Sequence, residues 1–257
     1  MKYDLLKKYK DYLEKMYSHE TARTYAIRLE CLFEGQSLTN IISQLDIPKV
    51  ISKLSEIKYK NHFSQSKNAF LHFCKFQNIV LDYEHLNTIN RLEKHTHKKY
   101  RNFQALNFDE VNNKIKHIKN QKLKLSFQTM LATGLRVFEL SQITPNQCFV
   151  SADEICFYFL AKGGKTEKVT IYKEDDSKLF VNLLELIEKT KKDNKLFYSA
   201  IYLQINAKKL GFKCHDLRRA YAKIEYKKTK SKELVMEKLR HTSIKTTNIY
   251  LRSKIKI

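Results

Sequence analysis

Apolar residues recur every three or four positions along most of this chain, which is the spacing of an amphipathic helix. Ser18 is suited to cap such a helix, whose apolar face would consist of Ala22, Tyr25, Ala26, Leu29, Leu32 and Phe33. The same spacing predicts two further helices, one with Pro48 in its first turn and one that begins near Ser64. We therefore expect residues 1–85 to form a small all-helical domain.

The pattern changes to that of a β-hairpin in the middle of the chain. Residues 154–160 and 167–172 are rich in β-branched and aromatic side chains, and the turn sequence Lys-Gly-Gly-Lys at 162–165 separates them. Helical spacing resumes from residue 175, and the chain has only 5 glycines and 2 prolines to interrupt helices. We expect a mainly α protein with a small antiparallel β-sheet or hairpin, in which a mixed α+β domain follows the helical one.

The chain is strongly basic. Its 49 Lys and Arg residues against 27 Asp and Glu give a formal net charge of +22. This charge favours a polyanionic partner, although a lysine-rich genome explains part of it, and charge alone does not separate DNA, RNA and anionic membranes. No apolar run approaches the roughly 18 to 20 residues that span a bilayer, and no signal-peptide core is seen. Five scattered cysteines without a CxxC pair favour a reducing, cytoplasmic location over disulfides or a zinc site.

Residues 86–103 interrupt the helical pattern with a run of positive charge, in which Glu93 is the single acid. The stretch is either a solvated charged face or a linker that follows a nucleic-acid backbone, and we favour the linker. Its basic side chains are candidate DNA-binding residues, namely Arg91, Lys94, Lys98, Lys99 and Arg101.

Three short segments carry candidate chemistry. They are Thr-Gly-Leu-Arg at 133–136, His-Asp-Leu-Arg at 215–218, and His241 followed nine residues later by Tyr250. Two guanidinium groups can hold the non-bridging oxygens of a phosphodiester. Histidines can transfer protons, and a tyrosine hydroxyl can act as a covalent nucleophile. The set therefore suits a phosphodiester that is attacked by a tyrosine.

With these segments in this order, the sequence resembles the tyrosine recombinases, also called the phage-integrase family, and the Xer-type members most of all. Residues 133–140 resemble the first motif of the family, residues 215–219 the second, and residues 239–250 the third. Lys162, at the tip of the predicted hairpin, matches the lysine of the family's hairpin.

The resemblance implies a domain organisation and a substrate. Residues 1–85 would be a helical DNA core-binding domain, residues 86–103 a basic linker, and residues 104–257 the catalytic domain. The partners would be double-stranded DNA with inverted-repeat recombination sites and further copies of the chain, as a tetramer on two DNA sites. Two alternatives stay open: a type IB topoisomerase, which relaxes DNA without exchanging strands, and a catalytically weak accessory integrase that only binds DNA.

The resemblance also implies a mechanism. Tyr250 would attack the scissile phosphate to form a 3′-phosphotyrosyl bond and free a 5′-hydroxyl, while Arg136 and Arg218 neutralise the phosphate. A 5′-hydroxyl of a partner duplex would then attack that bond, and strands would be exchanged through a Holliday junction. Because one phosphodiester-type bond replaces another, and no cluster of metal ligands is visible, we expect no cofactor and no metal.

The remaining residues receive roles by the same resemblance. His215 would accept the proton of the tyrosine or orient it, and His241 would donate a hydrogen bond to the phosphate. Lys162 would be the general acid for the 5′-oxygen, with Lys165 as its rival. Glu139, one turn after the first catalytic arginine, would orient a catalytic side chain.

Structural interpretations of some of these residues stay open as well. Arg218 and Arg219 could lie on an ordinary basic helix face, and Glu139 could simply pair with a lysine. Lys165, Arg219 and Arg240 complete the candidate DNA-binding residues.

The chain departs from the family pattern at two places. Arg240 stands where the family usually has glycine, and a long side chain there needs space or a phosphate. Seven residues follow Tyr250, whereas family members usually carry a longer tail that docks on a neighbouring protomer, so a weaker or differently joined tetramer is expected.

Overall fold

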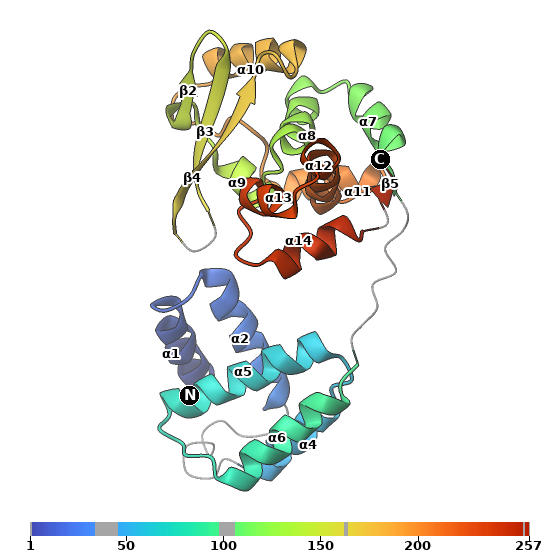
Figure 1. Cartoon of the computed structure of the whole chain (residues 1–257). Coiled ribbons are helices and arrows are strands. Elements are labelled where there is room, and N and C mark those ends of the chain that lie inside the picture. The colour runs from blue at the N-terminus through green and yellow to red at the C-terminus, as the bar shows by residue number, and fades with distance from the viewer. Residues whose placement is uncertain (1, 34–45, 98–105, 162–163, 254, 257) are drawn as a thin grey trace. The chain divides into compact units, whose positions relative to one another are not determined.

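The computed structural model describes residues 2–33, 46–97, 106–161, 164–253 and 255–256. The chain divides into two compact units, Met1–Arg101 and Asn102–Ile257. Each unit has its own hydrophobic core, and Figure 1 shows the helices and strands of both.

The first unit is built of helices in its described part, apart from an isolated β-bridge between Tyr59 and His97. Its helices are α1 (Lys2–Glu14), α2 (His19–Leu32), α4 (Ile47–Ser55), α5 (Lys60–Phe76) and α6 (Tyr83–His95). Ser18 caps α2 by accepting a hydrogen bond from the Thr21 backbone N–H, and Pro48 lies in the first turn of α4, so both predictions are confirmed. The third helix was expected to begin near Ser64, which is wrong, because α5 begins one turn earlier at Lys60.

The apolar faces of these helices meet in one core. Tyr9 of α1 is fully buried, and its hydroxyl donates to the backbone carbonyl oxygen of Ala69 on α5 at 3.1 Å. The core side chains come from every described helix of the unit and include Leu13, Ala22, Leu29, Val50, Leu54, Phe63, Phe70, Phe73 and Ile89.

The structure has a helix where the sequence predicted the first part of a linker. Residues 86–95 lie in α6, which packs into the first unit through Ile89. Glu93 also ties α6 to α5, because its carboxylate accepts a hydrogen bond from Lys67 Nζ at 2.6 Å. Arg91 and Lys94 are exposed on this packed helix. The other candidates of the stretch, Lys98, Lys99 and Arg101, lie outside the described residues.

The second unit is mixed α+β. Its helices are α7 (Phe108–Lys116), α8 (Gln121–Thr133), α9 (Val137–Gln142), the 3-10 turn η1 (Pro145–Gln147), α10 (Ser177–Lys189), α11 (Ala200–Lys209), α12 (Cys214–Thr229), α13 (Lys232–Lys238) and α14 (Ile244–Leu251). Its strands are β1 (Leu106–Asn107), β2 (Cys148–Val150), β3 (Glu154–Leu160), β4 (Thr166–Tyr172) and β5 (Ile255–Lys256).

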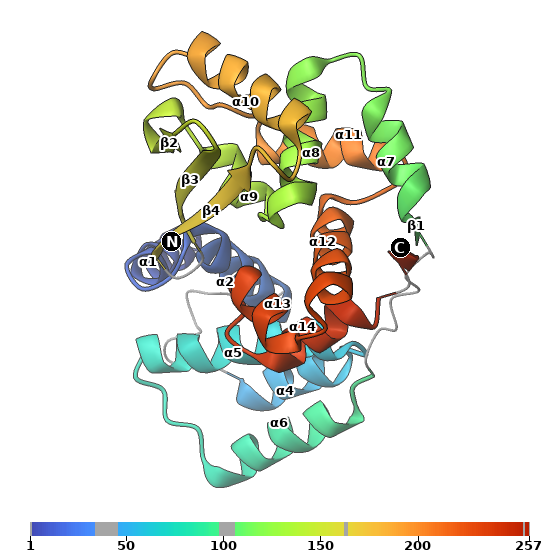
Figure 2. The same ribbon diagram turned by 45° about the horizontal axis from the view of Figure 1, so that its top comes forward.

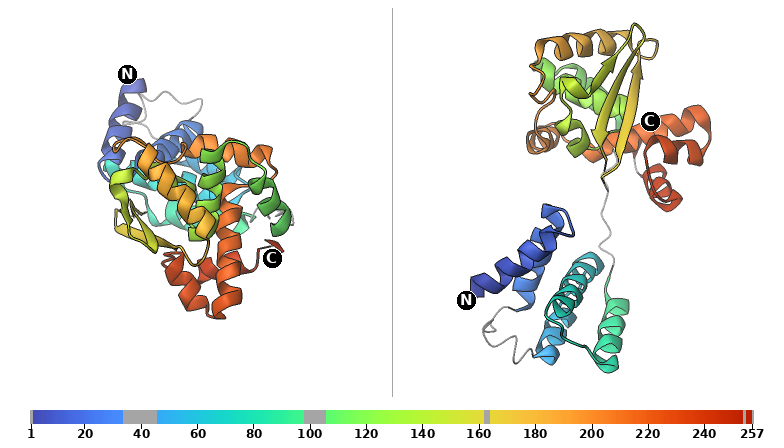
Figure 3. Two further views of the ribbon diagram at one scale, coloured as in Figure 1. Left: turned by 90° about the horizontal axis from the view of Figure 1, so that it is seen from above. Right: turned by 90° about the vertical axis from the view of Figure 1, so that its left-hand side faces the viewer.

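The predicted hairpin is confirmed as the β3–β4 pair of a small antiparallel sheet. The strand order is β2-β3-β4, with Phe157 opposite Val169 and Leu160 opposite Thr166. One face of β3 is buried through Ile155, Phe157 and Phe159. Helix α10 lies at the end of the sheet where β3 begins and β4 ends (Figures 1 and 3). The fold class is therefore the expected one, mainly α with a small antiparallel sheet.

Helix α12 is the central element of the second unit. It contacts α8, α11, α13, α14 and β5, and Figure 2 shows it with α13 and α14 on one side and α8 on the other. The last described strand, β5, pairs in parallel with β1. Lys223 on α12 fixes this strand, because its Nζ donates to the carbonyl oxygens of Ser253 and Ile255 at 2.6 and 2.7 Å. Residues 255–256 thus pair within their own unit.

Candidate active site

Arg218 lies at the centre of the candidate site. Helix α12 begins at Cys214, so His215 and Arg218, three residues apart, lie on the same side of its first turns. The Arg218 side chain is fully buried. Its Nη1 and Nη2 atoms donate hydrogen bonds to the carbonyl oxygens of Gly134 and Leu239. One guanidinium group therefore connects the three segments that carry the candidate chemistry.

Gly134 makes the close approach of these segments possible. It ends α8 in the left-handed region with φ +63°, where residues with a Cβ atom are strained. A Cβ atom here would also lie 2.5 Å from Cδ1 of Tyr221, on α12. The glycine therefore lets the α8 end pack against α12 and present its carbonyl oxygen to Arg218.

Glu139 holds Arg136 at the start of α9. Glu139 Oε2 accepts a hydrogen bond from the Arg136 backbone N–H at 2.8 Å, and Oε1 accepts one from Arg136 Nη1 at 2.6 Å. Burial acts to raise the pKa of Glu139, but the hydrogen bonds from Arg136 and the charges of Arg136 and Arg240 outweigh it and hold the pKa below its usual range. The carboxylate is buried, while 32% of the Arg136 side chain is exposed, so a fixed guanidinium faces solvent.

Tyr250 lies between the two histidines of the site. Its ring centre is 5.1 Å from that of His215 and 4.7 Å from that of His241, and both contacts are edge-to-face. Helix α14 places Thr247 three residues before Tyr250 on the same face, and Thr247 Oγ1 lies 3.0 Å from His241 Nδ1. The guanidinium of Arg219 lies over the tyrosine ring, 6.0 Å from its centre. These contacts fix the ring plane of the tyrosine.

Both histidines are uncharged at neutral pH. Burial and then the charges of Arg218 and Arg136 lower the pKa of His241 to about 4. Desolvation and then the charges of Arg219 and Arg218 lower the pKa of His215 to about 4. His215 keeps an exposed surface, so water screens part of the charge effect there. A neutral imidazole can accept a proton at one nitrogen or donate from the other.

The site has buried hydrogen-bond donors that await an acceptor. Within the described part of the chain, Arg218 Nε and His241 Nε2 are buried without a hydrogen-bond partner. When the Thr247 hydroxyl donates to Nδ1 of His241, the ring carries its proton on Nε2 and is a donor there. Burial and the charge of Arg136 lower the pKa of Arg218 to about 10, so it stays cationic at neutral pH. Cationic and neutral donors in one buried place suit an oxyanion.

Comparison with known proteins decides the family. The model of the phage integrase family matches residues 104–256. The chain belongs to the phage integrase family of tyrosine recombinases. No curated protein matches the chain.

Solved structures of recombinases share the fold. The XerH site-specific recombinase bound to difH substrate is 20% identical, with a TM-score of 0.61 over 89% of this chain and 74% of XerH. The lambda integrase tetramer bound to a Holliday junction is 14% identical, with a TM-score of 0.66 over 98% and 77%. The Tn1549 transposon integrase in complex with circular intermediate DNA is 16% identical, with a TM-score of 0.63 over 96% and 94%.

The structure of this recombinase brings most of the candidate catalytic residues together. Arg218, His215, His241 and Tyr250 lie together on α12, the turn before α14 and α14 itself. Arg136, with Glu139 behind it, lies near enough for its charge, after the larger effect of burial, to lower the pKa of Arg218 and of both histidines. Lys162 lies outside the described residues. Lys165 is exposed at the hairpin, where its carbonyl oxygen accepts from the Ala161 backbone N–H at 2.8 Å.

Two residues predicted to bind DNA lie inside the site of the recombinase instead of on its surface. Arg219 is 8% exposed and pairs with Asp216 at 2.8 Å. Arg240 has 10% of its side chain exposed and lies beside Glu139. Thr247 is a site residue that was not among the candidates from the sequence, although its place three residues before Tyr250 on a helix indicates a shared face.

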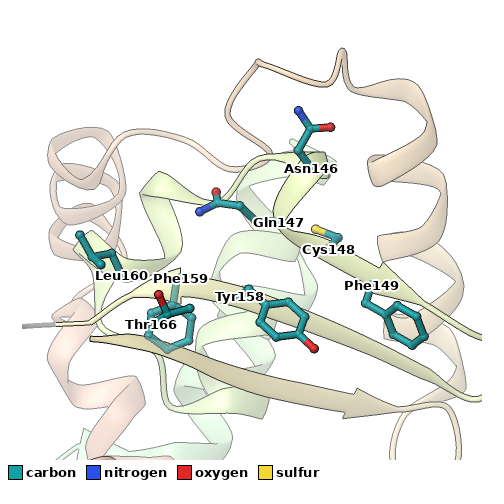
Figure 4. A pocket seen from close by; sticks show the side chains of 8 residues that line it. All are labelled: Asn146, Gln147, Cys148, Phe149, Tyr158, Phe159, Leu160 and Thr166. Carbon is teal, nitrogen blue, oxygen red and sulfur yellow. The ribbon is translucent and has the colours of Figure 1, made fainter. Parts of the chain in front are cut away.

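A separate hollow of about 470 Å³ lies beside the small sheet. Figure 4 shows its lining from η1 and the three strands, which consists of Asn146, Gln147, Cys148, Phe149, Tyr158, Phe159, Leu160 and Thr166. None of the candidate catalytic residues that the structure describes lines it. Among the residues that the structure describes, no helix is both long and apolar enough to cross a bilayer, and no group of three or more His, Cys, Asp or Glu side chains is placed to bind a metal ion.

Proposed function

We propose that this recombinase cleaves and rejoins duplex DNA at specific sites, with Tyr250 as its nucleophile. The observation that carries the proposal is the placement of Tyr250 beside two buried, unpartnered donors, Arg218 Nε and His241 Nε2. The tyrosine hydroxyl supplies the nucleophile for attack on a phosphodiester, and the neighbouring donors can bind the oxyanion that forms.

The phosphate is bound by side chains with different roles. Arg136, whose guanidinium is fixed by Glu139 and exposed to solvent, and Arg218, through its Nε, neutralise the non-bridging oxygens. His241 donates from Nε2. Because the charge on these oxygens grows as phosphorus becomes five-coordinate, fixed donors stabilise the transition state more than the ground state.

In the proposed reaction one bond to phosphorus forms as another breaks, so no cofactor is needed. The Tyr250 oxygen forms a bond to phosphorus as the bond from phosphorus to the 5′-oxygen breaks. Neutral His215, edge-on to the tyrosine ring, accepts the phenolic proton, and Lys162 supplies a proton to the departing 5′-oxygen. Attack by the 5′-hydroxyl of a partner duplex reverses these steps and joins new strands.

The partners that we propose are double-stranded DNA with inverted-repeat sites and further copies of the chain, as a tetramer on two sites. The net charge of +22 supports an anionic partner. XerH and the Tn1549 integrase, which share the fold, were solved with DNA, and lambda integrase was solved as a tetramer on a Holliday junction. Action in the cytoplasm and a core-binding role for the first unit are part of the same proposal.

A nicked duplex tests the nucleophile. The DNA is taken from the inverted repeats beside the coding sequence, with a nick close to the cleavage position so that the short cleaved strand diffuses away and the covalent complex accumulates. We expect an SDS-resistant complex with the wild type and with the control Tyr202→Phe, whose tyrosine lies on α11. Tyr250→Phe should bind the DNA equally in a native gel and form no such complex.

Two results would contradict the proposal. One is a covalent complex that persists in Tyr250→Phe, or whose DNA-linked peptide maps to another tyrosine. The other is relaxation of a supercoiled plasmid without any inverted repeat by the monomer, which would indicate a type IB topoisomerase.

A further inference from the structure

Arg240 has a backbone conformation that rarely carries a side chain. Its φ is +53°, in the left-handed region that glycine adopts most easily. Arg240 lies between the end of α13 and His241, and its backbone N–H donates to the Glu237 carbonyl oxygen at 2.8 Å. A strained backbone conformation persists only where other contacts hold it, so we expect the Arg240 side chain to make such contacts beside His241.

The Arg240 side chain is built into the site. Only 10% of it is exposed. Its guanidinium carbon lies 5.0 Å from the centre of the Phe159 ring, so it stacks on strand β3. Nη1 donates to the Lys238 carbonyl oxygen at 3.2 Å, and Nη2 lies 3.5 Å from Glu139 Oε2. The side chain therefore connects β3, the turn before His241 and the start of α9.

Glu139 connects Arg240 to Arg136, the candidate catalytic residue. Its Oε1 binds Nη1 of Arg136, while its Oε2 is shared between the Arg136 backbone N–H and Arg240 Nη2. A carboxylate held by both Arg136 and Arg240 has fewer rotamers than one held by Arg136 alone. The direction in which Arg136 presents its guanidinium thus depends on what holds Glu139.

We propose that Arg240 is a positioning residue for DNA cleavage, which holds Glu139 and through it the guanidinium of Arg136. The inference rests on the proposed function, because it assigns Arg136 to the scissile phosphate. Arg240 acts on the carboxylate and not on the DNA.

The test replaces Arg240 by glycine, which accepts φ +53° without strain. The matched control is Lys230→Gly. Lys230 has φ +55° and is an exposed cation at the end of α12, so this change also removes one positive charge and one left-handed side chain. Cleavage is followed in a single turnover at saturating nicked duplex. We expect the rate to fall about 10- to 100-fold in Arg240→Gly, the range for residues that orient a catalytic group, and to stay unchanged in Lys230→Gly.

Affinity and stability distinguish positioning from other roles. We expect Arg240→Gly to bind the duplex within about threefold of the wild type, since one of many charges is lost, and to unfold at no lower urea concentration. Arg240→Asn, which also tolerates the left-handed region, should show the same loss of rate. Slow cleavage in variants that fold and bind normally is not produced by a merely structural residue.

A double-mutant cycle with Glu139→Gln identifies the path of the effect. If Arg240 acts through Glu139, the double variant is about as slow as the slower single variant. Multiplying defects would mean that Arg240 contacts the DNA itself, and would overturn the inference. A wild-type cleavage rate in Arg240→Gly would overturn it as well.

These outcomes are separate from a failure of the proposed function. If the wild type forms no covalent complex through Tyr250, the proposed function fails. If the wild type forms the complex and Arg240→Gly forms it equally fast, only the role of Arg240 fails.

Discussion

Gly134→Ala is the substitution whose cost can be worked out most directly from the structure. The new Cβ atom would lie 2.5 Å from Cδ1 and 2.9 Å from Cε1 of Tyr221, and 3.1 Å from Cδ2 of Leu239. Carbon atoms in contact normally stay about 3.5 to 4.0 Å apart. The Tyr221 ring or the end of α8 must therefore move, and the end of α8 bears the carbonyl oxygen that binds Arg218.

The expected loss of stability has two parts. An L-residue in the left-handed region costs about 1 to 2 kcal/mol, which applies because φ of Gly134 is +63°. Forcing a methyl group into a packed region costs about 1 to 3 kcal/mol more. The sum, about 2 to 5 kcal/mol, is a large share of the stability of an ordinary domain, about 5 to 15 kcal/mol. DNA cleavage should fall further than stability alone explains, because the Arg218 guanidinium loses its fixed position.

Urea unfolding of three variants separates the two parts. Gly211→Ala has the same kind of backbone strain, with φ +85°, but its Cβ would meet only the flexible end of Lys114 at 3.4 Å, so we expect a loss of about 1 to 2 kcal/mol. Tyr221→Ala removes the ring atoms Cδ1 and Cε1, so Gly134→Ala made in that background should lose most of the steric cost and keep the backbone part. The reasoning is refuted if Gly134→Ala destabilises the protein no more than Gly211→Ala does.

Two further predictions concern His241 and the strand β5. The pKa of His241 is about 4 in the folded protein and near 6.5 in an unfolded chain. The stability that depends on a neutral His241 is therefore fully present above pH 6.5 and is lost as the pH falls toward 4. The free energy of unfolding should drop by up to about 3 kcal/mol over this window, and less in His241→Gln; an equal drop in both would contradict the assignment. Lys223→Met leaves the carbonyl oxygens of Ser253 and Ile255 without their donor, at about 1 to 3 kcal/mol. Amide exchange of β5 should then become faster while α8 stays protected, and unchanged exchange of β5 would show that Lys223 does not hold the strand.

The amphipathic pattern predicted the helices and the hairpin well because those signals are local. Ser18, Pro48 and the turn at 162–165 mark ends of elements by their own backbone preferences. The prediction failed at residues 86–95, where many charges hid a helix. Ile89 is buried there, and Glu93 pairs with Lys67 from another helix. Such a pairing depends on the neighbouring helix, which the pattern of one segment does not contain.

The sequence predicted which residues form the candidate site but not how they are arranged in space. The types and spacing of Arg136, Arg218, His241 and Tyr250 indicated phosphodiester chemistry. The sequence could not show that Arg218 is fully buried and bound to two backbone carbonyl oxygens, because those carbonyls lie 84 and 21 residues away along the chain. It could not show the left-handed backbone of Arg240 either, since that conformation is imposed by the turn into His241.

The most costly local features of the second unit gather where the phosphate would bind. A guanidinium is fully buried at Arg218, two histidines have their pKa values lowered to about 4, and Arg240 has a strained backbone. The buried guanidinium and the strained backbone are each unfavourable for folding by themselves, and the two histidines become unfavourable as the pH falls. Together they keep donors and neutral imidazoles in place before the DNA arrives, so little reorganisation remains for the cleavage step. The hydrophobic clusters of the second unit supply the stability that lets these features persist, and this division of roles explains why local propensity does not predict the geometry of the site.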